Sequence, residues 1–214
     1  MTLDDALEDL PIFPLPNGVL FPRAQLELHI FEPRYRALLE ASLDTHRCIA
    51  IAQILPGTDA EGVPHIATIA GAGTIEQRHR LPDGRSHIVL VGRARVLLDE
   101  LPFEPPFRRA RARIVADIED EPANATDELT LVAAIQGFVD ALRKEGTTVT
   151  FERAGDVPAA ELAHHAAQHL LFDGRVKQEI LEMRNPRERI GKIAVELMAQ
   201  RALLLGGPKG SQSN

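Results

Sequence analysis

The spacing of apolar residues changes near residue 118, and this change limits the folds open to the chain. Before it, apolar residues recur at every second position, as in Leu26, Leu28 and Ile30, which is typical of a strand covered on one face. After it, they recur every three or four positions, as in Leu129, Val132 and Ile135, which is typical of amphipathic helices. The pattern predicts an α+β protein with its strands first and most of its helices second.

The first part is broken by Gly and Pro into short strand-like segments. We expect strands at residues 25–31, 47–55, 66–79, 86–98 and 107–118. The step Asp83-Gly84 predicts a tight hairpin turn, and many short strands at this spacing favour a barrel or sandwich over a parallel sheet. One helix interrupts them, beginning at Glu32-Pro33, because proline is tolerated at the first helical position. Its apolar stripe consists of Tyr35, Leu38, Leu39 and Leu43.

The chain therefore divides into a β subdomain at residues 1–120, a helical subdomain at 121–205 and a disordered tail at 206–214. Helices are expected over residues 129–142, 158–171, 175–183 and 186–204. Gly146 is expected to end the first of these, and Asn185 before Pro186 to cap the last. The tail is rich in Gly, Pro and Ser and has little to bury.

Charge and cysteine content narrow the possible partners and the compartment. The net charge is −7, and residues 1–122 contain 19 acidic and 13 basic residues, the latter all Arg. Such an acidic balance argues against general nucleic-acid binding, which needs cations to neutralise phosphates. The single Cys48 excludes an intramolecular disulfide and suits a reducing compartment. The sequence has neither a signal-peptide pattern nor an apolar run of about 18 residues, so we expect a cytoplasmic protein that does not span a membrane.

Four blocks of the sequence resemble, in order, a known domain. They are LPIFPLPNGVLFP at residues 10–22, LELHIFEPRYR at 26–36, LPDGR with LVGRARV over 81–96, and FDGRVKQEILE with RERI over 172–190. Together they resemble the N-terminal domain of Lon protease. Val96 stands where that family commonly has an aromatic residue, so packing at that corner is expected to differ.

The resemblance implies a PUA-like β-barrel with an inserted helix, followed by a helical bundle. It also implies recognition of polypeptides, with unfolded or specific polypeptide clients as partners, and it leaves room for a separate protease partner and a homo-oligomer. The predicted contact surface combines the Pro-rich segment, the start of the first helix and the loop at 101–107. It consists of Pro14, Pro16, Phe21, Pro22, Phe31, Tyr35, Phe103 and Phe107.

Two interpretations of the Pro-rich segment stay open. Its apolar residues, Phe13, Leu15, Val19 and Phe21, either plug one end of the barrel or form an exposed rim that binds unfolded segments. Apolar residues beside turns are more often core than surface, whereas an exposed apolar patch with aromatic anchors suits peptide binding.

Catalytic motifs are missing from the sequence. It contains no G-x-x-x-x-G-K-[ST] phosphate loop and no G-x-S-x-G nucleophile elbow, so we expect neither an enzyme nor a cofactor. His165 and His169 share a helix face four residues apart, as two zinc ligands would, with Glu161 one turn earlier. The general-base Glu of H-E-x-x-H is missing, so a solvated helix face is the preferred interpretation over a metal-dependent hydrolase, and no metal is expected.

An Arg-rich sheet face supports an alternative function. Alternation places Arg109, Arg111 and Arg113 on one face, and Arg93 and Arg95 are spaced in the same way. Because PUA-like barrels elsewhere bind RNA, these five residues define an RNA-binding alternative. The acidic balance and the scarcity of aromatic residues for base stacking argue against it, so nucleic acid is not the expected partner.

Overall fold

β1 (Leu10–Leu15) closes the strands of the first part into a ring. It pairs in parallel with β3 (Cys48–Thr58) on one side and antiparallel with β7 (Arg108–Ile114) on the other. The ring continues from β7 through β6 (Ser86–Glu100) and β5 (Ile69–Arg80) back to β3. The structure is a computed structural model that describes residues 2–60, 62–118, 122–151 and 157–206.

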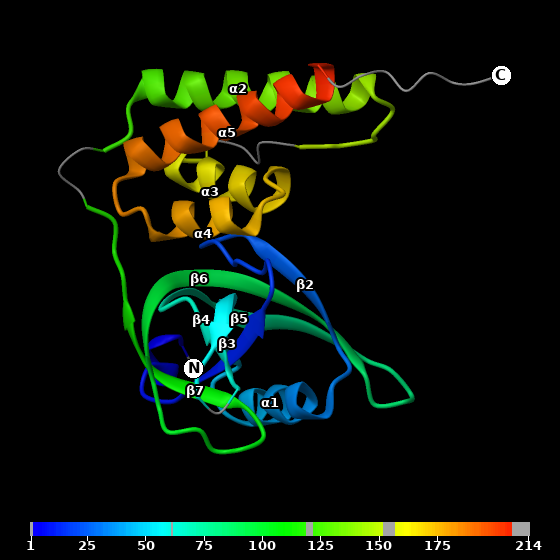
Figure 1. The fold of residues 1–214 in the computed structure, drawn as a ribbon, viewed down its shortest axis with the longest axis vertical. Coiled ribbons are helices and arrows are strands. Elements are labelled where there is room, and N and C mark those ends of the chain that lie inside the picture. The colour runs from blue at the N-terminus through cyan, green and yellow to red at the C-terminus, as the bar shows by residue number, and fades with distance from the viewer. Residues whose placement is uncertain (1, 61, 119–121, 152–156, 207–214) are drawn as a thin grey trace.

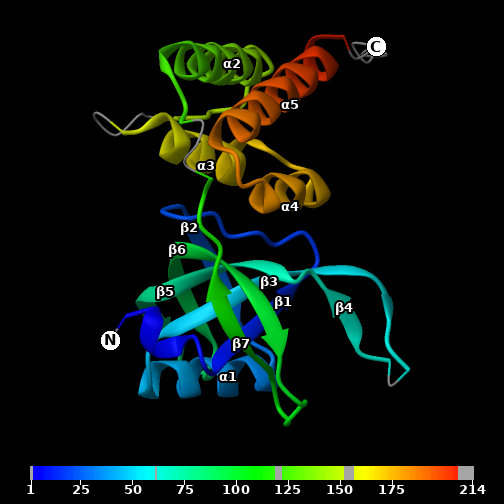
Figure 2. The ribbon, with the colours of Figure 1, turned by 90° about the vertical axis from the view of Figure 1, so that its left-hand side faces the viewer.

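The remaining elements cover this ring and extend from it. β2 (Gln25–Ile30) pairs with the first half of β6, and β4 (Pro64–Ile66) pairs with β3. A short 3₁₀ turn, η1 (Asp4–Ala6), precedes β1, and the helices are α1 (Pro33–Asp44), α2 (Ala125–Lys144), α3 (Ala159–Leu170), α4 (Gly174–Glu182) and α5 (Pro186–Gly206). Figure 1 shows the helices α2–α5 together above the strands, with α1 below them, and Figure 2 shows β4 projecting to one side of the ring.

The five predicted strands are confirmed, and one strand was not predicted. The segments expected at 25–31, 47–55, 66–79, 86–98 and 107–118 contain β2, β3, β5, β6 and β7, and the Asp83-Gly84 turn joins β5 to β6. The Pro-rich opening, which is outside the predicted strands, contains β1. Proline is compatible with a strand where its missing N–H is not needed by the ladder.

Buried apolar residues form three clusters, and β3 serves two of them. Its Cys48, Ala50 and Ala52 pack with β1, β5, β6, β7 and η1, whereas Ile49 and Ile51 pack with α1. This strand is therefore covered on both faces. The third cluster lies within α2–α5 and also contains Val19, Phe21 and Ala24, which precede β2.

The helical part begins and ends where local capping favours it. Asn124 and Asp127 form a reciprocal capping box on α2, and Asn185 accepts from the N–H groups of Arg187 and Glu188 at the start of α5, as predicted. Gly146 follows α2 with a positive φ of 85°, as expected of a residue that ends a helix. One helical prediction is wrong: Leu129 is exposed, because α2 turns Leu131 and Phe138 into the core.

Other predictions concern residues outside the described ranges. The boundary at residues 120 and 121 and the tail from 207 to 214 lie there, while Gly206 ends α5. In the described part of the chain no helix is both long and apolar enough to cross a membrane.

A notch of glycines lets the chain cross the sheet. A Cβ atom added to Gly71 of β5 or Gly92 of β6 would overlap the carbonyl oxygen of Leu20 or Phe21, respectively. Arg23 N–H donates to the Gly92 carbonyl at 2.8 Å, and Gly92 N–H donates to the Ala24 carbonyl at 2.9 Å. Glycine inside a strand commonly marks such an approach of a second backbone. The crossing segment is thereby fixed against β5 and β6.

We expect Gly71→Ala to lower the free energy of unfolding by about 3 kcal/mol or more, because the added methyl group must displace a backbone carbonyl. Gly191→Ala is the matched control: nothing lies within 4 Å of a Cβ there, and alanine in a helix interior should stabilise by about 1 kcal/mol. Urea unfolding followed by circular dichroism measures both. Equal effects of the two substitutions would contradict the notch.

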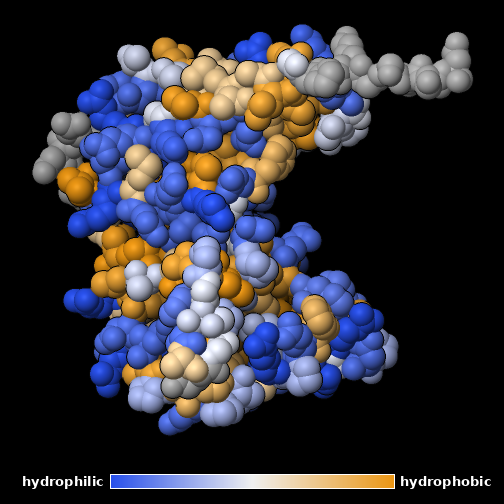
Figure 3. Space-filling view, in the orientation of Figure 1, coloured by the Kyte–Doolittle hydropathy of each residue, from blue (hydrophilic) through white to orange (hydrophobic). Residues whose placement is uncertain are grey.

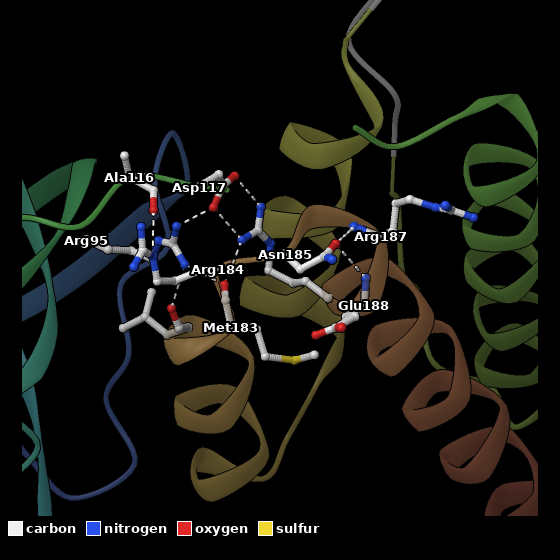
Figure 4. A network of polar contacts seen from close by, with 10 residues as sticks. Arg95, Ala116, Asp117, Met183, Arg184, Asn185, Arg187 and Glu188 are labelled. Carbon is white, nitrogen blue, oxygen red and sulfur yellow. Dashed lines mark hydrogen bonds and ion pairs between the residues drawn. The ribbon is translucent and has the colours of Figure 1, made fainter. Parts of the chain in front are cut away.

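A buried ionic network joins the two parts of the molecule (Figure 4). Asp117, in the connection from β7 to α2, accepts from both terminal guanidinium nitrogens of the fully buried Arg189 at 2.8 Å and also pairs with Arg95. Arg95 and Arg189 both donate to the carbonyl of Met183, at 2.5 Å and 2.9 Å. Burial alone would raise the pKa of the Asp117 carboxyl, but the hydrogen bond and charge of Arg189 and the charge of Arg95 outweigh it and lower that pKa.

His164 of α3 is buried near this network, against the ring of Phe21 at a centroid distance of 5.7 Å. Burial, together with the positive charge of Arg189, lowers the pKa of His164 to about 3 from an ordinary value of 6.5. Its Nε2 atom has no hydrogen-bond partner among the described residues. The imidazole therefore stays neutral in the folded protein at pH values where the unfolded chain takes up a proton.

We expect stability to fall as the pH drops from 6.5 towards 3, because only the unfolded state binds the His164 proton in that window. Between pH 6.5 and pH 5 the loss from this residue approaches about 2 kcal/mol. His164→Leu should remove that share of the loss, measured by urea unfolding at both pH values, while His165→Leu on the same helix should keep it. An unchanged pH dependence in His164→Leu would exclude the mechanism.

Candidate functional site

Two adjoining hollows form an apolar groove beside β1, β2 and the start of α1. One, of about 260 Å³, is lined by residues that include Tyr35, Val63, Phe103 and Phe107. The other, of about 200 Å³, is lined by residues that include Phe13, Leu28 and Phe31. Because Pro14, Arg34, Tyr35 and Ile54 line both hollows, we treat them as one surface, called the apolar groove.

The aromatic residues of the groove differ in exposure, and this divides their roles. Phe13 and Tyr35 are buried, and their rings stack at a centroid distance of 4.1 Å, so they form a fixed floor. Phe31 and Phe103 expose 56% and 58% of their surface. A half-exposed phenylalanine at the edge of an apolar hollow gains from covering by a partner, since burial of apolar surface stabilises association.

The charged residues of the groove are already paired. Arg34 contacts Glu32 at 2.9 Å and lies over the Tyr35 ring at 4.5 Å. Arg108 pairs with Glu100 at 2.6 Å and donates to the Pro64 carbonyl at 2.7 Å, which connects the start of β4 to the groove wall. Burial raises the pKa of the Tyr35 hydroxyl above its ordinary value, so that group stays neutral. The groove thus offers neutral, apolar surface.

The structure brings together six of the eight residues predicted for the contact surface. Along the groove lie Pro14, Pro16, Phe31, Tyr35, Phe103 and Phe107. The prediction for Phe21 is wrong. This residue is completely buried among α2–α5, because the glycine notch directs the chain under the helices. Pro22 follows Phe21 and is half-buried, outside the residues lining the groove. For Phe13, Val19 and Phe21 burial is observed rather than an exposed rim, while Leu15 is half-buried at the groove.

Only three of the five arginines predicted to bind RNA lie together on one strand face. Arg109, Arg111 and Arg113 do lie on the outer side of β7, but Arg109 pairs with Asp9 and Glu104, and Arg111 lies 3.6 Å from Glu8. Arg95 is 4% exposed within the ionic network, so its predicted place beside Arg93 is wrong. A bulge explains the error, because the β5–β6 register passes from Gly92 to Ala94 and leaves Arg93 unpaired in the ladder.

The side chains considered as a zinc site, His165, His169 and Glu161, are not gathered around one point. Glu161 lies 3.2 Å from Arg23, with which it forms an ion pair, and the ring centroids of His165 and His169 are 6.3 Å apart. Within the described residues no three His, Cys, Asp or Glu side chains are grouped to hold a metal ion. Cys48 is buried, and burial raises the pKa of its thiol, which disfavours the reactive thiolate.

Sequence reasoning missed part of the groove and an apolar surface elsewhere. Ile54, shared by both hollows, and Val63 before β4 contribute through tertiary contacts alone. The helical part also exposes large apolar residues, shown near the top of Figure 3. The most exposed of these are Leu129, Phe172 and Leu203.

Solved structures of similar fold place this arrangement in one class. A Lon N-terminal domain protein from Xanthomonas campestris matches with a TM-score of 0.65 at 20% identity, over 87% of this chain and 97% of that one. The N-terminal domain of a Mycobacterium avium complex Lon protease matches with a TM-score of 0.67 at 14% identity, over 89% and 98%. The fold is therefore that of Lon N-terminal domains.

Sequence comparison then gives the family. The profile described as the ATP-dependent protease La (LON) substrate-binding domain matches residues 9–200, so the chain belongs to this family. Lon protease of Vibrio parahaemolyticus is 26% identical over 184 residues, which cover 85% of this chain and 23% of that protein. Lon protease of Nitratidesulfovibrio vulgaris is 28% identical over 198 residues, which cover 86% and 23%. The chain thus spans about a quarter of the length of these relatives.

Proposed function

We propose that this chain is a non-catalytic module that binds extended, apolar segments of polypeptides in the apolar groove. The observation that carries the proposal is the pair of half-exposed phenylalanines, Phe31 and Phe103, beside the fixed floor of Phe13 and Tyr35. Membership of a substrate-binding family supports it. In this proposal the ring of strands is the PUA-like barrel implied by the resemblance, and the helices α2–α5 are its bundle.

The proposed role in the cell is to hold polypeptides without altering them. A module that holds unfolded or specific polypeptide clients acts as an adaptor or chaperone, and a separate protease is the natural recipient of such clients. The neutral, apolar surface of the groove favours segments with large apolar side chains, since aromatic anchors in desolvated pockets carry most of the affinity in such interfaces.

A peptide-binding measurement tests the proposal. A fluorescein-labelled 15-residue peptide containing two phenylalanines should bind, as followed by fluorescence anisotropy. Phe31→Ser combined with Phe103→Ser should weaken binding about ten-fold or more, because two aromatic contacts are lost. Both side chains are exposed in the free protein, so the melting temperature should change little.

Phe172→Ser is the matched control, because Phe172 is 67% exposed but lies in the helical part. Equal binding by the double variant and the unmodified protein would contradict the proposal. Binding of a labelled single-stranded RNA, with a steep salt dependence that is lost on replacing Arg109, Arg111 and Arg113 by Ala, would instead favour the alternative function.

A further inference from the structure

The strand β2 has an open edge. It pairs with β6 and with no other strand, whereas each strand of the ring has a partner on both sides. In the part of the chain that the structure describes, no backbone hydrogen bond joins residues 25–30 to a segment other than β6. The N–H and C=O groups along such an edge can pair with another extended chain.

The alternation of antiparallel pairing shows which residues face the open edge. Gly92 of β6 donates its N–H to the Ala24 carbonyl at 2.9 Å, so Ala24 faces β6. The bond from the Leu81 N–H to the Arg85 carbonyl, at 2.8 Å, gives the same alternation from the other end of β6. Successive residues face alternately toward the partner strand and away from it. The residues whose N–H and C=O groups point away from β6 are therefore Gln25, Glu27 and His29.

This open edge runs beside the apolar groove. Leu28 and His29 line the smaller hollow of the groove, together with residues 13–16, and Phe31 follows the strand directly. The side chains of Leu26 and Leu28 are half-buried against the cluster that contains the floor of the groove. Every second side chain of a chain added to this edge would continue that apolar face.

The strand has few of the features that block pairing at an edge. Proline, lysine and bulges commonly prevent the edges of sheets from pairing with other chains. β2 contains neither proline nor lysine, and its register with β6 is unbroken from Gln25 to Ile30. The carboxylate of the exposed Glu27 is the one such charge on the strand. An extended chain can therefore approach along its full length.

We propose that the polypeptide bound in the apolar groove lies as an added β-strand on the open edge of β2. Its backbone N–H and C=O groups pair with those of Gln25, Glu27 and His29, and its side chains alternate between the groove and solvent. This inference rests on the proposed function and adds a preference. The module selects segments that are extended and carry apolar residues at every second position.

Hydrogen exchange of individual backbone amides, followed by NMR, tests the pairing. The probe is the 15-residue peptide with its two phenylalanines separated by one residue. In the free protein, the amides that face the open edge should exchange rapidly, whereas those of Leu26, Leu28 and Ile30 should exchange slowly because they are bonded to β6. With the peptide at about ten times its Kd, exchange at Gln25, Glu27 and His29 should slow about ten-fold.

A proline on the strand tests the same pairing from the side of the protein. Glu27→Pro removes an N–H that faces away from β6, and it should weaken peptide binding about five-fold or more, because a hydrogen bond is lost and the ring obstructs the edge. Glu27→Ala is the matched control, since it removes the same side chain but keeps the N–H, and it should leave the affinity unchanged. Circular dichroism shows whether each variant is folded.

A series of N-methylated peptides keeps the inference testable if Glu27→Pro fails to fold. Each peptide carries one N-methyl group, and methylation at every second residue should weaken binding to the unmodified protein about five-fold, because only alternate N–H groups face β2. Methylation of the residues between them should have little effect.

Three outcomes would overturn the inference. Rapid exchange at Gln25, Glu27 and His29 with the peptide bound, or an N-methyl series without alternation, overturns it and leaves the groove proposal standing. Slow exchange at these residues without peptide, together with a dimeric mass in sedimentation, assigns the edge to a second copy of the chain and likewise overturns it. No binding of any peptide overturns both proposals.

Discussion

The side-chain amide of Gln168 holds the two parts of the molecule together through a single short stretch of backbone. It accepts from the N–H of Phe21 at 3.0 Å and donates to the carbonyl of Val19 at 3.1 Å. That stretch lies against the glycine notch, where side chains are excluded and the peptide groups cannot reach water. Without Gln168 two buried peptide groups would be left unpaired, at a cost of about 1–3 kcal/mol each. The seating of the helices on the strands depends on this pairing.

The same constraint positions the groove. Residues 13–16 line the groove, and Leu20 and Phe21 lie against the notch glycines, so only three residues separate the groove from its anchor. The ionic network of Asp117, Arg95 and Arg189 fixes the other connection, from β7 to α2. Both connections between the strands beside the groove and the helices are thus held by buried polar contacts, which suits binding that depends on preformed shape.

Local pattern predicted the elements, because alternation and helical spacing depend on neighbours in the sequence. Gln25–Ile30 and the cap at Asn185 are examples. What could not be predicted depends on contacts between distant segments. Phe21 and Phe31 both follow an apolar residue, yet one meets the helices and the other meets solvent. Likewise, a bulge at Arg93 reverses the side on which Arg95 lies. The groove was predicted in part because prolines and aromatic residues gather in two segments of the sequence, but Ile54 joins it only through tertiary contacts.

In the proposed function, the division among the eight phenylalanines lets one surface bind many segments and still discriminate. Buried Phe13 gives the groove its shape, whereas Phe31 and Phe103 are exposed and restrict few torsions when covered, so contact with them costs little conformational entropy. Because Arg34 and Arg108 are paired with neighbouring carboxylates, the selection proposed for the groove is by apolar size rather than by charge. In the proposed function, this loose selection along the groove is then a consequence of how the fold pairs the charged groups around it.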